Sequence, residues 1–136
     1  MPEPEGTTAH AGPVLVLQRP AFVDERGEIR NLLDVPLTSV AVITSVNGAV
    51  RGNHYHKTDY HYCWLQSGRM IYAHRPVGVK SPPQEWVINA GQMLYTPPMY
   101  EHVMRFLEHS VMFAFAKNNR EMENYEADTV RIASLL

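Results

Sequence analysis

The chain has 136 residues, of which 45% are hydrophobic and 19% charged, proportions that are typical of a globular domain and too apolar for a disordered chain. Its net charge of -2 argues against a nucleic-acid-binding protein, and it has no apolar run of membrane-spanning length and no recognisable signal peptide. The single cysteine excludes an intrachain disulfide, so we expect a soluble, cytoplasmic protein with one folded domain.

The expected elements are short strands separated by turn residues. Residues 1–13 are rich in Pro, Glu, Thr and Gly and are predicted to form a mobile arm, whereas residues 14–136 are predicted to form one β domain. Strands are expected, in chain order, at residues 14–18, 27–33, 39–46, 61–66, 69–75, 85–88, 92–96, 102–107 and 111–116. The fourth and fifth of these flank a short turn, as do the last two, so each pair is predicted to be a hairpin. A helix is expected only at residues 119–127, and the turn spacing favours a β-sandwich or barrel.

The functional argument depends on four of the seven histidines. His54 and His56 are separated by one residue, so on a strand both rings point to the same face. His61 can return on the neighbouring strand, and His102 begins a later one. Converging imidazoles favour one divalent transition-metal ion (Zn, Ni, Fe, Cu, Co or Mn) over Mg or Ca, which prefer oxygen ligands. We predict all four histidines as ligands. The alternative for His61 is a ring that hydrogen-bonds a neighbour, with Asp59 or water completing the shell.

The glycines around these histidines match a known pattern. Residues 48–68 resemble the first cupin motif, G-x5-H-x-H-x3,4-E-x6-G, with His61 in place of its usual glutamate. Residues 91–106 resemble the second motif, G-x5-P-x-G-x2-H-x3-N, with Met99 and Phe106 in place of glycine and asparagine. The resemblance implies an all-β fold, the double-stranded β-helix or jelly-roll barrel of the cupins. A shell of four neutral imidazoles would leave the full charge of the ion at the site and make it a stronger Lewis acid.

Two groups of cupins share further strings with this chain. The string RGNHYH at residues 51–56 and the segment at residues 96–102 resemble the metal-binding cupin domain of bifunctional UDP-sugar epimerase–reductases of capsule biosynthesis. The strings DERG at residues 24–27 and Tyr125-x-x-Asp128 resemble elements of dTDP-4-keto-6-deoxysugar epimerases and ketoisomerases, which use a histidine base without a metal. Those enzymes lack a histidine matching His102, so the chain is more similar to the metal-bearing group.

The resemblance implies an enzyme that epimerises or isomerises a nucleotide-linked keto-sugar by moving a proton next to a carbonyl. Tyr100, in the loop that carries His102, and Lys57 are the candidate proton-transfer residues. The alternative for Tyr100 is a side chain packed under that loop. Two other functions stay open, namely a cupin dioxygenase with a redox metal and a non-catalytic cupin that binds a metal or a sugar.

Substrate contacts are expected from Arg51, Tyr72, His74 and Tyr95. Arg51 can pair with a diphosphate or form a surface ion pair, and His74 either faces the cavity mouth or is solvated. Alternation along the strand places Cys63 and Leu65 on the inward face with His61, and it places three aromatic residues on the opposite face: Tyr55, Tyr62 and Trp64. Exposed sheet edges and these aromatic residues predict a homodimer formed by strand exchange or sheet packing.

Overall fold

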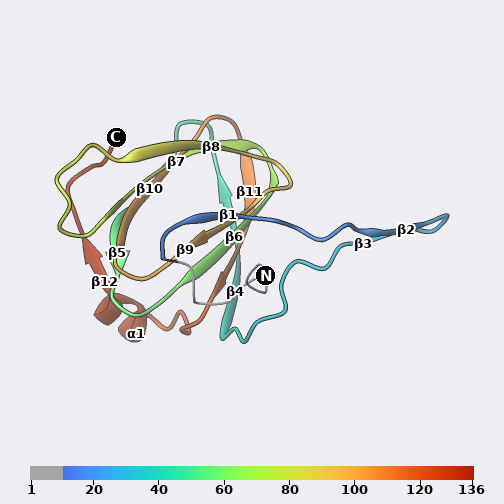
Figure 1. Ribbon diagram of the computed structural model, residues 1–136, viewed down its shortest axis with the longest axis horizontal. Helices are drawn as coiled ribbons and strands as arrows, with labels where there is room; N and C mark the ends of the chain where they lie inside the picture. Colours follow the sequence, from blue (N-terminus) through green and yellow to red (C-terminus); the bar gives the residue numbers. More distant parts are fainter. Residues whose placement is uncertain (1–10) are drawn as a thin grey trace.

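Ten strands lie in two five-stranded antiparallel sheets that face each other (Figure 1). The computed structural model describes residues 11–136, so ten of the thirteen residues of the predicted arm, and His10, lie outside the described residues. The first sheet has the order β1 (Val14–Val16), β9 (Met93–Thr96), β6 (His61–Ser67), β11 (Ser110–Ala116) and β4 (Ser39–Ser45). The second has the order β12 (Thr129–Arg131), β5 (Val50–His56), β10 (Tyr100–Phe106), β7 (Arg69–Pro76) and β8 (Gln84–Asn89). The predicted all-β barrel is confirmed.

Both predicted hairpins are wrong, because the chain changes sheets at each of the two turns. β6 pairs with β9 and β11, whereas β7 pairs with β8 and β10, and the same division separates β10 from β11. The two crossovers contact each other: a Cβ on Gly68 would lie 2.0 Å from Ser110 Oγ, and the φ of Gly68 is +95°. The Ser67-Gly68 dipeptide therefore lies in a crossover between the two sheets and not in a hairpin turn.

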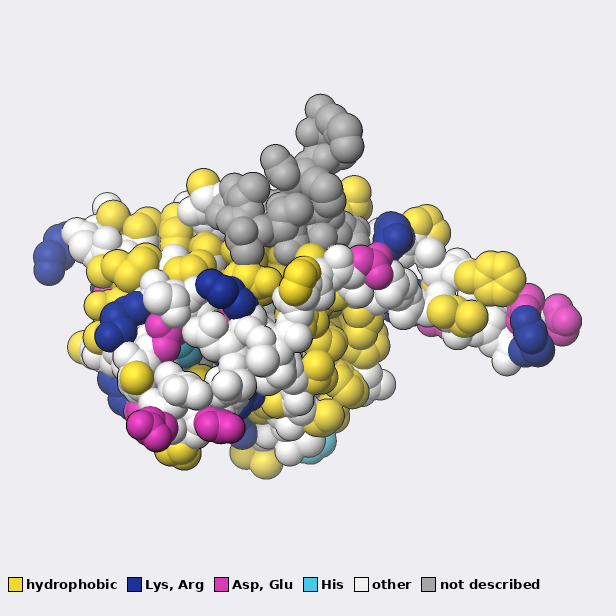
Figure 2. All heavy atoms as spheres, turned by 90° about the horizontal axis from the view of Figure 1, so that it is seen from below, with side chains coloured by type: hydrophobic (Ala, Val, Ile, Leu, Met, Phe, Trp, Pro, Cys, Tyr) yellow, Lys and Arg dark blue, Asp and Glu magenta, His cyan; other side chains and the backbone are white. Residues whose placement is uncertain are grey.

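A two-stranded ribbon extends away from the sheets (Figures 1 and 2), and only its second strand was predicted. β2 (Phe22–Asp24) pairs with β3 (Gly27–Ile29), and the expected strand at residues 27–33 ends at Ile29. The hydrophobic side chains of Phe22, Val23 and Ile29 are 60–68% exposed on this ribbon. The helix expected at residues 119–127 is α1 (Met122–Asp128), and no helix among residues 11–136 has the length and apolar character needed to cross a membrane.

Two apolar clusters pack on opposite faces of the first sheet. The first cluster lies between the sheets and includes Cys63 and Leu65, the residues predicted to face inward. The second lies on the outer face, where Tyr62 packs with Tyr95 and Trp64 lies alongside, as the alternation predicts. Leucine and valine side chains from the segment before β4 cover this outer cluster: Leu32, Leu33, Val35 and Leu37. The histidine face of β6 is therefore separated from its tyrosine face by the sheet itself.

Candidate metal centre

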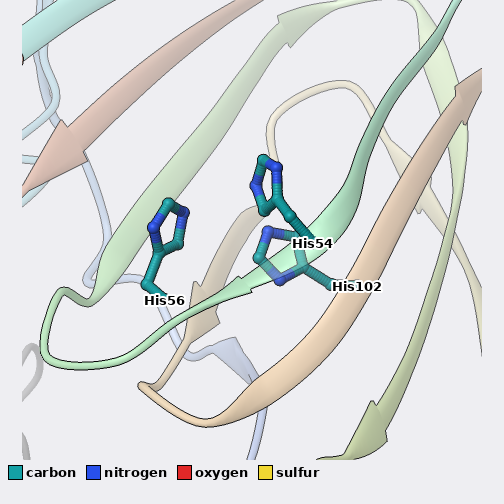
Figure 3. A group of neighbouring side chains, drawn as sticks. All are labelled: His54, His56 and His102. Atoms are coloured by element: carbon teal, nitrogen blue, oxygen red, sulfur yellow. The ribbon is translucent and has the colours of Figure 1, made fainter. Parts of the chain in front are cut away.

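Three of the four predicted ligands meet at one point in the barrel. His54 and His56 project from β5, and His102 projects from the neighbouring strand β10 (Figure 3). One ring nitrogen from each lies within 4.8 Å of the others, and all three residues are buried, with exposures of 8%, 3% and 5%. Since His102 lies directly opposite His54 in the strand register, the pairing of β5 with β10 brings the two motifs together.

The residues before His54 explain why these two strands come so close. Gly52 has a φ of +102°, and a Cβ at this position would lie 2.9 Å from the carbonyl oxygen of His102. Asn53 also has a positive φ, 57°, which asparagine tolerates better than most residues, and its Oδ1 accepts a hydrogen bond from the backbone N–H of Leu135. The Gly-Asn pair therefore sets the position of His54 against β10.

Hydrogen bonds fix the tautomers of two rings. His102 Nδ1 donates to the carbonyl oxygen of Tyr100 at 3.0 Å, so its Nε2 carries the lone pair. The hydroxyl of Thr129 donates to the carbonyl of Tyr125 at 2.6 Å and so accepts from His56 Nδ1 at 3.3 Å. Nε2 of His56 is therefore also an acceptor, and this atom and His54 Nδ1 are buried and have no hydrogen-bond partner within residues 11–136. Such unpaired lone pairs in a buried group are suited to a metal ion.

Burial keeps the three rings neutral, which is the form that binds metal ions. It lowers the pKa of His54 to about 2, that of His56 to about 3 and that of His102 to about 4. Repulsion by neighbouring imidazoles adds to the effect at each ring. A cluster of neutral imidazoles needs no proton release before it binds a cation near neutral pH.

His61 lies beside this group but has another partner. Its ring centroid is 4.6 Å from that of His56, while its Nε2 donates to Asp59 Oδ2 at 2.9 Å. Asp59 also accepts from the backbone N–H of Asn118 at 3.0 Å, so the carboxylate is held in place. The structure thus supports the alternative interaction for His61, a hydrogen bond to a neighbour, and leaves Nδ1 as its lone-pair atom. Its role as a fourth ligand stays a prediction.

A cavity of about 260 Å³ opens beside the histidines. Its apolar wall comes from Ile43, Met104, Met112 and Ala114, and Cys63 joins His54, His61 and His102 in the lining. Three arginines complete it: Arg51, Arg120 and Arg131. Among the described residues, no aspartate or glutamate lines this cavity.

The predicted substrate-binding residues are only partly brought together. Arg51 lines the cavity, where its guanidinium group donates to Ser45 Oγ and to the carbonyl of Thr44, both at 2.9 Å. Tyr72 is fully buried in the core, and its hydroxyl shares a 2.7 Å hydrogen bond with Thr96. Tyr95 lies in the outer cluster, on the other face of the first sheet.

His74 is buried, so its predicted solvation is wrong. The ring stacks on Tyr72 with centroids 5.1 Å apart and meets Trp86 edge-on at 4.4 Å. Burial lowers the pKa of His74 to about 4. The residue does not line the cavity, although it lies opposite His102 in the register of β7 and β10.

Neither predicted proton-transfer residue lines the cavity. Tyr100 is half-buried, and its ring centroid lies 6.3 Å from that of His74. Lys57 is exposed and lines a separate groove with Thr58 and Asp128. Residues from the C-terminal segment line the cavity instead: Arg120, Tyr125 and Arg131. The Tyr125-x-x-Asp128 string drew attention to this segment, but no sequence signal indicated the two arginines.

Solved structures of a sugar ketoisomerase, a sugar epimerase and a capsular polysaccharide assembling protein share this architecture. The ketoisomerase QdtA of Thermoanaerobacterium thermosaccharolyticum, in complex with TDP, is 21% identical, and the match covers 90% of each chain with a TM-score of 0.72. The dTDP-4-dehydrorhamnose 3,5-epimerase of Sulfolobus tokodaii is 22% identical over 94% of this chain and 81% of that one, with a TM-score of 0.74. The capsular polysaccharide assembling protein CapF of Staphylococcus aureus is 22% identical over 84% of this chain and 34% of that one, with a TM-score of 0.65.

No family model matches the chain, and no curated protein matches it. At these identities the structural likeness shows the fold, which is the cupin fold of the sugar epimerases and ketoisomerases. The predicted resemblance is confirmed at that level. The buried trio of histidines adds a site with the donor atoms for a metal ion.

Proposed function

We propose that the chain is a metal-dependent enzyme that epimerises or isomerises a nucleotide-linked keto-sugar by proton transfer next to the carbonyl group. The main support is the histidine trio, in which one ring nitrogen from each of His54, His56 and His102 lies within 4.8 Å of the others. Two of these rings have a buried nitrogen without a hydrogen-bond partner among residues 11–136. The names of structural neighbours add a second argument, because they include a 3,4-ketoisomerase crystallised with TDP-4-keto-6-deoxyglucose and a 3,5-epimerase.

The three residues fit a divalent transition-metal ion. Two of the three rings have their second nitrogen occupied by an oxygen acceptor, the arrangement that orients metal-binding imidazoles in proteins. A bound divalent ion supplies Lewis acidity, which stabilises negative charge that develops on a carbonyl oxygen. Met104, Met112 and Ala114 give the cavity an apolar wall, and electrostatic interactions are stronger beside apolar groups than in bulk water.

His61 is the best-placed residue to hold the migrating proton. It lines the cavity, and Asp59 fixes its tautomer by accepting from Nε2, so Nδ1 is the atom that can take a proton. Tyr125 also lines the cavity and offers a hydroxyl as a proton donor. These two residues replace Tyr100 and Lys57 as our candidates, because a proton-transfer group must reach the substrate within hydrogen-bond distance.

We further propose that two copies form a homodimer through the β2–β3 ribbon. An isolated two-stranded ribbon is marginally stable in water, and this one exposes three large apolar side chains. The outer face of β4 exposes Val40 and Val42, each 61% exposed, and so offers an apolar surface to the ribbon of a second copy. Light scattering should give twice the monomer mass for the wild type and the monomer mass for Phe22→Asp. A monomeric wild type contradicts this proposal.

Metal analysis and isotope exchange test the proposed reaction. Protein purified without an affinity tag or chelator should contain about one transition-metal ion per chain, and His54→Ala and His102→Ala should lose it. His109→Ala, at an exposed histidine, is the matched control. Incubation with TDP-4-keto-6-deoxyglucose in deuterated water should place deuterium next to the carbonyl without oxygen uptake.

The same assays separate the alternative functions. Oxygen consumption that depends on the metal would indicate a dioxygenase. Metal binding without exchange on any of several keto-sugar nucleotides would indicate a non-catalytic cupin. Full metal content in both histidine variants would contradict the metal site itself.

A further inference from the structure

The cavity beside the histidine trio is strongly one-sided in charge. Three guanidinium groups line it, and none of its described lining residues is an aspartate or glutamate. Two of these arginines, Arg120 and Arg131, come from the C-terminal segment that flanks α1, whereas Arg51 comes from β5. Positive side chains next to apolar ones in the lining favour a ligand that carries negative charge into the cavity.

The contacts of the three arginines differ in how much charge they neutralise. Arg51 donates to a hydroxyl and a carbonyl, both neutral, so it is positioned without being neutralised. Arg120 lies over the ring of Tyr125, 4.9 Å from the centroid, and so presents its guanidinium group from a stacked position. Arg131 pairs with Glu126 at 2.8 Å, but both side chains are about half exposed, and such pairs contribute little.

Strand pairing places Arg131 next to the histidine trio. Arg131 lies opposite His54 in the register of β12 and β5, so the two side chains project from the same face of the second sheet. Arg120 and Arg131 line the same cavity as His54 and Cys63. Both arginines therefore belong to the wall that also carries the histidines.

We propose that Arg120 and Arg131 bind an oxyanion, a carboxylate or a phosphate group of the ligand, inside the cavity next to the histidine trio. An arginine fork matches the two oxygens of either group. The cavity of about 260 Å³ is at the small end for ligand sites, so it accommodates one charged group and the part of the molecule next to it. This inference depends on the proposed function in one respect only, namely that the reacting carbonyl group of the ligand lies at the histidine trio.

Anion binding to metal-free protein tests the proposal without any turnover. Isothermal titration with pyrophosphate and with malonate, after removal of metal by a chelator, separates a phosphate group from a carboxylate. Loss of one charge-assisted contact in Arg120→Gln or Arg131→Gln should weaken binding by about tenfold or more. Arg30→Gln is the matched control, because Arg30 also pairs with a glutamate, Glu28, and lies outside the cavity.

Arg120→Lys and Arg131→Lys keep the positive charge but lose the two parallel donors of the guanidinium group, so these variants should bind with intermediate affinity. They also serve if a glutamine variant folds poorly, which circular dichroism will reveal. Equal affinity in the wild type and in all variants at these two positions would overturn the proposal, as would binding of neither anion by the wild type. The titration contains neither metal nor a keto-sugar substrate, so its result does not depend on whether the proposed reaction takes place.

Discussion

Acid should unfold the metal-free protein through its buried histidines. Four of them are more than nine-tenths buried, and burial lowers their pKa values to about 2, 3, 4 and 4: His54, His56, His74 and His102. In the unfolded chain an imidazole titrates near pH 6.5, so below that pH the unfolded state binds more protons than the folded state. The free energy of unfolding is therefore highest above about pH 6.5 and falls as the pH decreases towards about 4.

The size of the effect follows from the number of groups. Each imidazole that is neutral when folded and protonated when unfolded contributes about 1.4 kcal/mol per pH unit. Four such groups together give a slope of about 5 kcal/mol per pH unit, comparable with the whole stability of a small domain. We expect the metal-free protein to lose its folded structure near pH 5, where few surface carboxylates have yet been protonated.

Urea unfolding at several pH values between about 7.5 and 5, with chelator present, measures this slope. His74→Phe keeps the stacking on Tyr72 and should reduce the slope by about one quarter, which is the share of one histidine among four. His109→Gln changes an exposed ring and should leave the slope unchanged. A wild-type slope below about 1.4 kcal/mol per pH unit would refute the reasoning, as would an unchanged slope in His74→Phe.

Two further predictions concern single contacts. Thr129→Val removes the oxygen that accepts from His56 Nδ1, so metal affinity measured by competition with a chelator should fall about tenfold or more; an unchanged affinity would contradict our assignment of the tautomer. Gly68→Ala places a Cβ 2.0 Å from Ser110 Oγ and should lower the free energy of unfolding by about 3 kcal/mol or more. Gly78→Ala is the control: Gly78 also has a positive φ, but an added Cβ would meet no atom of the described residues within 4 Å beyond its chain neighbours, so the loss should be only about 1 kcal/mol. Equal losses in the two variants would show that the contact between the crossovers is unimportant.

The strand pattern was predictable from sequence because turn residues and alternation are local properties. The alternation of Cys63 and Leu65 with Tyr62 and Trp64 already divided β6 into an inner and an outer face. Strand pairing is not local. The same Ser67-Gly68 turn can close a hairpin or carry the chain between sheets, and only the packing of Gly68 on the second crossover decides between them.

The histidine trio was predictable for the same reason, and its surroundings were not. Spacing put His54 and His56 on one face, and the second motif supplied His102. The partner of His61 depended on Asp59 being held by a backbone N–H from a distant segment, which no short string reveals. Likewise, Arg131 reaches the cavity because the chain returns through α1 and pairs β12 with β5, which places Arg131 opposite His54.

The absence of a carboxylate from the described cavity lining has a chemical consequence. Three neutral imidazole ligands would not offset the charge of a divalent ion, and the two carboxylates near the histidines have other partners: Asp59 accepts from His61, and Asp128, 3.8 Å from His56 Nδ1, accepts from Thr58. With guanidinium groups in the same wall, negative charge that appears in the cavity can be stabilised from two sides. An enolate formed from an anionic keto-sugar carries two negative charges at different places: one on the enolate oxygen and one on the phosphate or carboxylate group of the ligand. Histidines from β5 and β10 and arginines from the C-terminal segment line the same cavity, so each group can stabilise one of these two charges, which links the proposed reaction to the proposed ligand class.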